Sequence, residues 1–332
     1  MSRRIWVVAQ QRGGKLHRMS LETLAAAHVL ASRVDGEVRG VVLSATPEPA
    51  AAELAAYALA GVLAVQHPAL DPYTPGAFVA ALESLIRDRQ PNIVLFPHSY
   101  QSVDHVPRLA QALGGALIPE VTGFTGSPEG DDELLWRRPV LGGKLQATVR
   151  VTGGDTPVLA TIQAGAFAAS DAPRGSSDIE TVDLSHAQIA ADREILGIED
   201  VAGDQVDLGQ APIIVGVGRG VGGADKLAPI EELARELGAE IGASRPVIDN
   251  GWLPRDRQIG SSGQTVAPKL YLAVGISGAI QHLVGMKGSR VVVAINKDPG
   301  APIFKLAQYG VVGDLHEIVP ALTAALRAAR GE

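Results

Sequence analysis

The sequence predicts an α/β protein of two domains, each a mainly parallel sheet flanked by helices. Short apolar runs alternate with helical patterns in both halves of the chain, and this order builds parallel sheets. The 332 residues exceed the usual size of one compact domain. Aromatic residues make up only 4% of the chain, so small side chains would let helices lie close on the sheets.

The composition excludes several kinds of site. The chain has no cysteine, so disulfides, cysteine-ligated iron–sulfur clusters and thiolate zinc sites are excluded, and any redox role requires an organic cofactor. The net charge of −7 argues against nucleic acid, whose phosphates require a basic surface. The first apolar run, Ile5–Ala9, is too short for a signal sequence or a membrane span. We therefore expect a cytoplasmic protein without membrane insertion.

The first half carries the pattern of a parallel sheet followed by an antiparallel annex. The expected strands of the parallel sheet are Ile5–Ala9, Val38–Leu43, Val62–Gln66 and Asn92–Pro97. The expected helices run from an N-cap at Ser20 to Gly36, over Ala51–Ala60 and over Phe78–Asp88. The annex is expected from Leu134–Arg138, Leu145–Val151 and Val158–Ile162, with turns at Gly142-Gly143 and Gly153-Gly154.

A polar stretch at residues 187–209, with a predicted polar helix and an acidic run, separates the two halves. We therefore expect an N-terminal domain at 1–200 and a C-terminal domain at 206–332. In the second domain, Asp225 is expected to cap a helix that ends at Gly238, and the last helix is expected from about Pro320. The expected strands are Ala211–Val217, Leu270–Val274, Val291–Ile295 and Gly310–Val312.

The run Gly218-Arg219-Gly220-Val221-Gly222-Gly223 matches the pattern G-x-G-x-x-G directly after a strand. Glycines let the backbone approach a phosphate, and the following helix offers its N-terminal amides. An NAD-linked dehydrogenase is one interpretation, because Glu240 lies at about the right distance for a ribose-binding acid. The next strand stops at Pro246, however, and Ser244-Arg245 are placed to reach into a ligand site. A nucleotide-binding regulatory module without redox activity is a further alternative.

The stretch Leu270–Asp298 is the most specific part of the sequence. A buried strand breaks at two glycines, and a helix is expected to begin near Ser277. Its first turns would present Ser277, Gln281 and His282 around a helix end that favours an anion or a polarised carbonyl. The next strand ends in Asn296-Lys297-Asp298, at the carboxyl edge where open α/β sheets bind ligands.

This stretch resembles the alpha subunit of electron-transfer flavoproteins, whose signature runs Tyr–x–Ala–x–Gly–Ile–Ser–Gly–Ala–x–Gln–His, then Gly–Met, then Ala–Ile–Asn–Lys–Asp. The matching positions are Tyr271, Gly275, Ser277-Gly278, Gln281-His282, Gly285-Met286 and Ala294–Asp298. The strong resemblance runs from about Val215 to the C-terminus, whereas the first half is similar only in organisation. The resemblance implies that the C-terminal domain is Rossmann-like and binds FAD in an extended pose.

The resemblance also implies which residues bind the cofactor, and it implies neither catalytic residues nor a metal. The cofactor-binding residues would be Arg219, Ser244, Arg245, Ile259, Gly260, Ser261, Ser262, Ser277, Gly278, Ala279, Ile280, Gln281, His282, Asn296, Asp314 and Leu315. Arg245 would lie over the flavin ring and His282 would face its pyrimidine carbonyl, where a cationic or hydrogen-bonding group raises the potential. Gln281 would serve the ribityl chain. The pyrophosphate and adenosine would be held by Arg219, Ser244, Ser277, Asn296 and Asp314.

The sequence departs from the family at one loop. Where the family has Gly-Gln-Thr-Gly, this chain has Gly260-Ser261-Ser262-Gly263. Ser262 then takes the place of the threonine expected near flavin N5, and it keeps a hydroxyl donor. The alternative is a local shift that brings Thr265 to that place.

By resemblance, the protein is an electron carrier rather than a substrate-converting enzyme. Its FAD would accept electrons from flavin dehydrogenases, such as the acyl-CoA dehydrogenases of fatty acid beta-oxidation, and pass them to a membrane quinone oxidoreductase. The N-terminal domain would be a platform for a beta subunit in a heterodimer, and a linker near Asp200 would let the flavin domain move. An electron-bifurcating member of the same family is the alternative.

Overall fold

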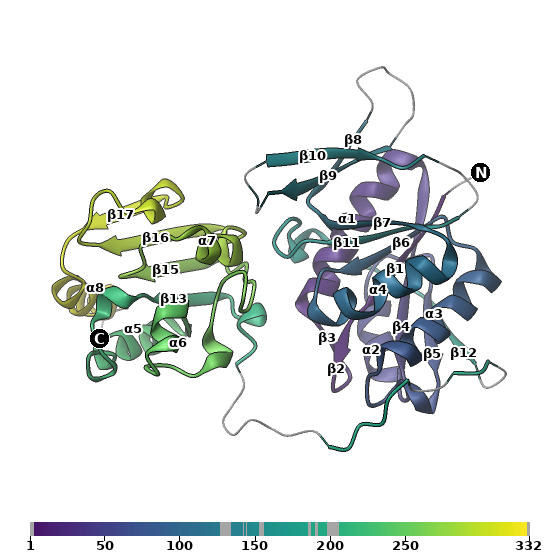
Figure 1. The fold of residues 1–332 in the computed structure, drawn as a ribbon, viewed down its shortest axis with the longest axis horizontal. Coiled ribbons are helices and arrows are strands. Elements are labelled where there is room, and N and C mark those ends of the chain that lie inside the picture. Colours follow the sequence, from purple (N-terminus) through teal and green to yellow (C-terminus); the bar gives the residue numbers. More distant parts are fainter. Residues whose placement is uncertain are drawn as a thin grey trace. The chain divides into compact units, whose positions relative to one another are not determined.

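The computed structural model describes residues 3–126, 134–141, 143, 145–152, 156–184, 187–189, 192–197 and 206–330. The chain divides into two compact units, Met1–Glu199 and Asp200–Glu332, and each has its own sheets and hydrophobic cores (Figure 1). The main sheet of each unit is parallel and carries helices on its faces, so the predicted fold class is confirmed.

The first unit is built on a seven-stranded parallel sheet in the order β12-β5-β4-β1-β6-β11-β7. Its strands are β1 (Arg3–Ala9), β4 (Gly36–Ser44), β5 (Val62–Gln66), β6 (Ile93–Pro97), β7 (Ala116–Val121), β11 (Val158–Ile162) and β12 (Ile179–Asp183). The residues of β1 alternate between two cores, with Ile5 and Val7 in one and Trp6 and Val8 in the other. Helices α1 (Arg18–Val34) and α2 (Glu48–Ala55) cover the first core, and α3 (Pro75–Arg89) and α4 (Tyr100–Leu113) cover the second.

A three-stranded antiparallel sheet adds to the first core, and its strands are β8 (Gly123–Gly126), β9 (Leu134–Val140) and β10 (Leu145–Arg150). Phe124 and Trp136 stack edge to face there, 5.3 Å between ring centroids. The predicted annex is thus confirmed for its first two runs. It is wrong for Val158–Ile162, which forms β11 of the parallel sheet because this run is apolar enough to be buried between β6 and β7. The predicted turn residues Gly142, Gly153 and Gly154 lie outside the described residues.

Both predicted ends of α1 and the predicted end of α2 are wrong. The cap of α1 is His17, whose Nδ1 accepts the Met19 amide at 3.2 Å. Ser20 lies inside the helix because its hydroxyl is bonded to the backbone of Gln10. Helix α1 ends at Val34 with Asp35 as its C-cap, in the left-handed region with φ 49°, rather than at Gly36. Helix α2 ends at Ala55 rather than Ala60. The chain after α2 pairs instead with the residues following Ala172, as shown by the Ala58 amide, which donates to the Pro173 carbonyl at 2.9 Å. Two short strands, β2 (Gln11–Arg12) and β3 (Lys15–Leu16), form a hairpin before α1.

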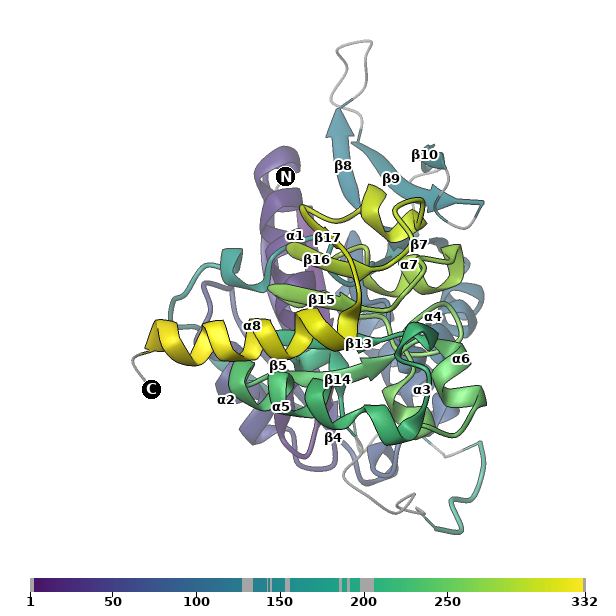
Figure 2. The same cartoon turned by 90° about the vertical axis from the view of Figure 1, so that its left-hand side faces the viewer.

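The second unit contains a five-stranded parallel sheet in the order β14-β13-β15-β16-β17. Its strands are β13 (Ile213–Val217), β14 (Glu240–Ala243), β15 (Leu270–Val274), β16 (Val291–Asn296) and β17 (Tyr309–Val312). Helices α5 (Ala228–Leu237) and α8 (Leu315–Arg330) pack together on one face, and Figure 2 shows α8 in yellow across that face. The short helix α7 (Ile280–Met286) belongs to the core of the other face, and α6 (Arg245–Asp249) follows β14. The chain order 2-1-3-4-5 reverses between β13 and β15, where open α/β sheets form a binding crevice.

The starts of α5 and α8 differ from the prediction. Asp225 lies in a 3₁₀ turn, Ala224–Lys226, and the residue before α5 is Leu227, so Asp225 is not the cap. The predicted end of α5 at Gly238 is confirmed, with φ 61°. Helix α8 begins five residues before Pro320. Its start is fixed by Asp314, whose Oδ1 accepts the His316 amide at 2.8 Å and whose carbonyl accepts the Ile318 amide at 3.0 Å.

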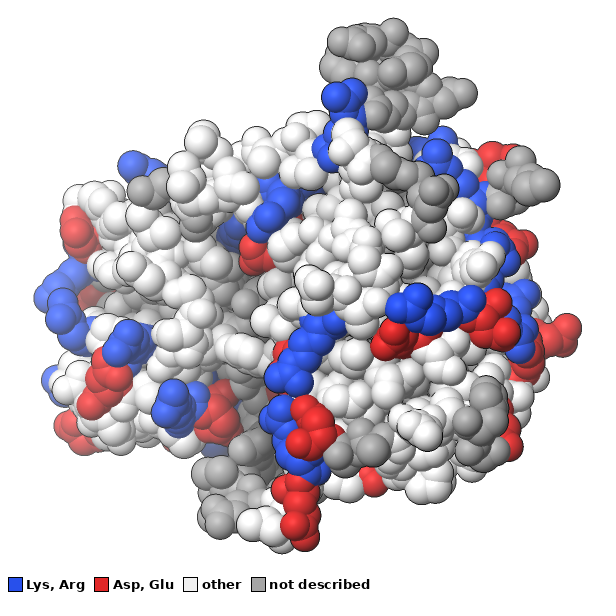
Figure 3. All heavy atoms as spheres, turned by 45° about the vertical axis from the view of Figure 1, so that its right-hand side comes forward, with Lys and Arg blue, Asp and Glu red and all other residues white. Residues whose placement is uncertain are grey.

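The charged side chains are mixed rather than segregated by sign on the face shown in Figure 3, where basic and acidic groups lie next to one another between large uncharged areas. Among the described residues, no helix is both long and apolar enough to cross a membrane. The polar helix predicted within residues 187–209 does not appear in the described parts of that stretch, which contain only the 3₁₀ turn Leu208–Gln210.

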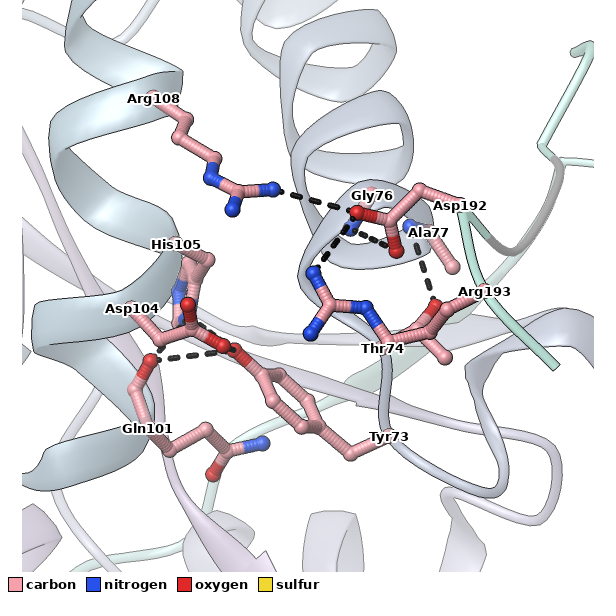
Figure 4. A network of polar contacts seen from close by, with 10 residues as sticks. All are labelled: Tyr73, Thr74, Gly76, Ala77, Gln101, Asp104, His105, Arg108, Asp192 and Arg193. Carbon is pink, nitrogen blue, oxygen red and sulfur yellow. Dashed lines mark hydrogen bonds and ion pairs between the residues drawn. The ribbon is translucent and has the colours of Figure 1, made fainter. Parts of the chain in front are cut away.

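A polar network holds residues 192–193 against the first unit (Figure 4). Asp192 Oδ1 accepts the Gly76 amide at 3.1 Å, at the start of α3. Asp192 Oδ2 pairs with Arg108 at 3.2 Å and with Arg193 at 3.1 Å. Nearby, the Tyr73 hydroxyl lies 3.2 Å from Asp104 Oδ2. Asp192 is therefore the point at which the segment that follows β12 is fastened to α3 and α4.

We predict that Asp192→Ala releases this segment without unfolding the unit, because Asp192 supplies its bonds to both helices. Hydrogen exchange followed by mass spectrometry should show faster exchange of the Gly76 amide and of residues 192–197. The hydrogen bond from Arg193 lowers the pKa of Asp192, so the anchor is charged at neutral pH and is lost as acid takes the pH down through that lowered value.

The matched control is Asp88→Ala, which removes an exposed carboxylate at the other end of α3. Among the described residues, its ion pair is with its neighbour Arg89. Equal exchange in the two variants would show that Asp192 is not the anchor.

Candidate functional site

The predicted site residues gather at the carboxyl edge of the second unit's sheet. Loops leave that edge after β13 (residues 218–223), β14 (244), β15 (275–279), β16 (297–298) and β17 (313–314). Parallel strands end at the same edge, so these loops form one rim. The predicted residues on or directly after the rim are Arg219, Ser244, Arg245, Ser277, Gly278, Ala279, Ile280, Gln281, His282, Asn296, Asp314 and Leu315.

The loops after β13 and β15 interlock backbone against backbone. The Gly218 amide donates to the Val274 carbonyl at 2.8 Å, and the Gly220 amide donates to the Gly275 carbonyl at 3.1 Å. A Cβ on Gly218 would lie 2.1 Å from the Gly275 oxygen, and one on Gly220 would lie 2.9 Å from the Gly275 Cα. These glycines were expected to let a phosphate approach the backbone. In the structure, glycine is already required at these positions for another reason, because any side chain there would separate the two loops.

The glycine-rich turn differs from the NAD fingerprint in two ways. Helix α5 starts at Ala228, five residues after Gly223, so the turn does not open directly into a helix as that fingerprint requires. Glu240 is the first residue of β14 and therefore lies at the opposite edge of the sheet, where it pairs with Arg257 at 3.1 Å. The acid expected on the ribose is thus absent from the rim, and the NAD-linked interpretation loses its structural support.

The loop after β15 offers a row of backbone donors. Helix α7 begins at Ile280, three residues later than predicted, because Gly278 adopts φ 87° and lies against Ile303. The amides of residues 277–279 donate no hydrogen bond to any part of the chain that the structure describes. Asn296 holds this loop through Nδ2, which donates to the Ile276 carbonyl at 2.9 Å. Consecutive free amides of this kind suit an anionic group.

The loop of residues 259–263 completes the rim. The Ile259 amide donates to the Ala243 carbonyl at the end of β14, and the Ser261 amide donates to the Gln281 carbonyl, both at 2.8 Å. The exposed Ser261 and Ser262 therefore lie beside the start of α7. The Ser262 hydroxyl accepts Gln258 Nε2 at 3.0 Å, so its proton is free for another acceptor.

His282 is buried behind this loop, with 5% of its surface exposed. Its Nδ1 lies 3.1 Å from the Ile259 carbonyl oxygen, and its Nε2 lies 2.9 Å from the Tyr271 hydroxyl. Burial lowers the pKa of His282 to about 4, so the imidazole is neutral near pH 7. Of the two expected possibilities, a cation or a neutral hydrogen-bonding group, the structure favours the neutral group.

Tyr271 is the residue that the sequence reasoning left without a role. It matches the family signature, but its position in an apolar strand gave no sign of its partner. The hydroxyl could have indicated that a partner exists, since a tyrosine buried in a strand requires a hydrogen-bond partner.

The exposed residues of the rim bring different chemistry. Arg245 is 70% exposed, and its one ion pair with the described residues is a loose contact with Asp249 at 3.4 Å, so its guanidinium is available to a ligand. Ile280 is an apolar side chain that remains 52% exposed. Free amides, a cation and an exposed apolar group at a sheet edge define a protein that binds a nucleotide cofactor.

Comparison with known protein families agrees with this class. Residues 5–187 match the electron transfer flavoprotein domain, and residues 207–287 match the electron transfer flavoprotein FAD-binding domain. The chain therefore belongs to the electron transfer flavoprotein alpha-subunit family, and FAD is its cofactor.

Individual relatives are similar over nearly their whole length. The chain is 39% identical to the electron transfer flavoprotein subunit alpha of Thermoanaerobacterium thermosaccharolyticum, over 96% of each chain. It is also 39% identical to the subunit of the same name from Bacillus subtilis, over 97% of each chain. A third relative, the acryloyl-CoA reductase electron transfer subunit beta of Anaerotignum propionicum, is 34% identical over 98% of this chain and 96% of its own.

We predict that Gly218→Ala disrupts the rim, because its Cβ would collide with the Gly275 backbone. Overpacking of this kind costs about 1–3 kcal/mol, which chemical denaturation can measure. Gly300→Ala is the control, since its Cβ would meet nothing closer than Asp298 Oδ1 at 3.3 Å. A Gly218→Ala protein as stable as the control would contradict the interlock.

Proposed function

We propose that this chain is the FAD-carrying subunit of a heterodimeric electron-transfer flavoprotein and that the rim described above holds the FAD. One observation carries the proposal. Residues 277–279 lie in the region that matches the family's FAD-binding domain, beside the interlocked glycine loops where the strand order of the sheet reverses, and their amides donate to no group among the described residues. When bound, FAD supplies the one- and two-electron chemistry that the side chains lack.

The donors on the rim suit the two ends of this cofactor. The pyrophosphate and adenosine would be bound by Arg219, Ser244, Ser277, Asn296 and Asp314, with backbone from Gly278, Ala279 and Leu315. Amides and a guanidinium are strong donors to phosphate oxygens. The flavin would lie toward the loop of residues 259–262, where Ile259, Gly260, Ser261 and Ser262 meet Ile280 and Gln281.

The residues expected beside the flavin differ in what they would contribute. Arg245 would supply positive charge, which favours the reduced and more negative flavin. His282 would contribute a fixed, neutral dipole from behind the loop, because its ring nitrogens are already bonded. Ser262 rather than Thr265 would supply the hydroxyl near N5. Its neighbour Ser261 is bonded to α7, whereas Gln264, next to Thr265, turns its side chain to the Leu208 amide.

The partners follow from the family. We propose that the N-terminal domain, residues 1–200, is a platform for a beta subunit, since its described residues include none of the proposed cofactor ligands. The donors would be flavin dehydrogenases such as acyl-CoA dehydrogenases of fatty acid beta-oxidation, and the acceptor a membrane quinone oxidoreductase, with the protein in the cytoplasm. The relative named as an acryloyl-CoA reductase subunit favours a second candidate, in which the complex belongs to the electron-bifurcating branch.

The direct test is to co-express the chain with the beta subunit from its own organism. We expect a 1:1 complex with flavin absorption bands, from which denaturation releases FAD. A complex that contains no FAD, or direct hydride transfer from NADH by this chain alone, would overturn the proposal. Oxidation of NADH coupled to two separate acceptors would favour the bifurcating alternative.

We predict that Arg245→Gln lowers the flavin midpoint potential, because it removes a positive charge from beside the ring. The expected change is on the order of 60 mV, equivalent to tenfold in a one-electron equilibrium. Arg235→Gln removes another exposed charge, from α5, and is the control. Spectroelectrochemical titration of both complexes measures the difference. Equal potentials would show that Arg245 does not lie near the ring.

A further inference from the structure

The buried pair of Tyr271 and His282 lies behind the loop of residues 259–263, and we infer that Tyr271 is the positioning residue of this site. Its hydroxyl fixes the imidazole of His282 as the Nδ1–H tautomer, and that imidazole fixes the loop. The inference rests on the proposed function only where it concerns FAD, since the geometry belongs to the chain itself.

Tyr271 reaches His282 through a space that a glycine leaves open. The side chain of Tyr271 is fully buried between β15 and α7. Its hydroxyl oxygen lies against β13, where a Cβ on Gly216 would be only 2.1 Å away. The single hydrogen bond recorded for this hydroxyl among the described residues joins it to His282 Nε2 at 2.9 Å. Burial raises the pKa of Tyr271, so the hydroxyl keeps its proton to donate.

The tautomer of His282 follows from its two partners. A backbone carbonyl can only accept, so the nitrogen facing the Ile259 oxygen, Nδ1, must carry the proton. In a neutral ring, Nε2 is then an acceptor, and the Tyr271 hydroxyl is the donor that satisfies it. The reverse tautomer would place a lone pair against the carbonyl oxygen. Tyr271 and Ile259 therefore select one tautomer and one ring orientation together.

The hydrogen bond of the imidazole is one of three that join residues 259–266 to α7 in the part of the chain that the structure describes. The other two join the Ser261 amide to the Gln281 carbonyl at 2.8 Å and the Val266 amide to the Gly285 carbonyl at 2.7 Å. The backbones are in direct contact, since a Cβ on Gly285 would lie 2.4 Å from the Gly260 nitrogen. Rotation of the imidazole would thus release the Ile259 carbonyl and loosen the loop that carries Ser261 and Ser262.

The first test needs no ligand. Long-range ¹H–¹⁵N correlation spectra of the full chain should show His282 with a protonated Nδ1 and an unprotonated Nε2. In Tyr271→Phe, Nε2 loses its donor, so its ¹⁵N shift should change and the reverse tautomer should appear. Gly216→Ala, which pushes on the hydroxyl from β13, should shift the same nitrogen. An Nε2–H tautomer in the unaltered protein would overturn the inference.

The second test follows the loop and the cofactor in the complex with the beta subunit. Tyr271→Phe should raise the exchange rate of the Ser261 and Val266 amides. It should also raise the dissociation constant of FAD. Each change should be about tenfold, the scale of one lost hydrogen bond. Tyr309→Phe removes an exposed hydroxyl from β17 and should change neither.

The outcomes separate the two proposals. FAD binding that is equal in Tyr271→Phe and Tyr309→Phe, with unchanged amide exchange, would refute the positioning role and leave the proposed function standing. If the unaltered complex binds no FAD, the proposed function fails, and the spectra and exchange rates still decide whether Tyr271 holds the loop.

Discussion

The second unit depends on close backbone packing at the point where the strand order of its sheet reverses. Gly218 and Gly220 meet Gly275 with no room for a Cβ, so the loops after β13 and β15 hold each other. Each loop thereby becomes part of the other's support, and neither requires a ligand to define its path. The interlock fixes the loop that carries residues 277–279, whose amides donate to no group among the described residues. Preorganised donors of this kind cost no rearrangement when an anion binds.

The same edge combines rigid and adaptable parts. Asn296 and the interlocked glycines fix the middle of the rim through short bonds to backbone. Arg219 and Arg245, by contrast, are exposed, and the one ion pair that they make with the described residues joins Arg245 to the exposed Asp249. A rigid donor row can select the kind of ligand, while exposed cations have room to adjust to the charge that develops on it.

Much of this architecture could be predicted from local pattern. The runs at Ile5–Ala9 and Leu270–Val274 are apolar throughout, as strands buried on both faces must be, and both are strands of parallel sheets. The errors arose where contacts with residues distant in the sequence determine the local structure. Ser20 has the chemistry of a cap, but its hydroxyl bonds to Gln10, and Val158–Ile162 joined the parallel sheet through partners about 40 and 65 residues earlier. The rim residues could be recognised by family resemblance, whereas the partner of His282 depends on a strand-to-helix contact that no local pattern records.

Gly216 and Tyr271 lie on neighbouring strands, and each limits what the other position can hold. A hydroxyl at position 271 requires the absence of a side chain at 216, because the two would occupy the same volume. The ring adds to this requirement, since a Cβ at 216 would also lie 2.5 Å from Tyr271 Cζ. The two side chains would be in direct contact, so the energetic effects of substitutions at 216 and 271 should not add. The two positions therefore constitute a single coupled unit, in which a side chain at 216 requires a smaller residue than an aromatic one at 271. The glycine in β13 provides the space that both the ring and the hydroxyl of the tyrosine occupy.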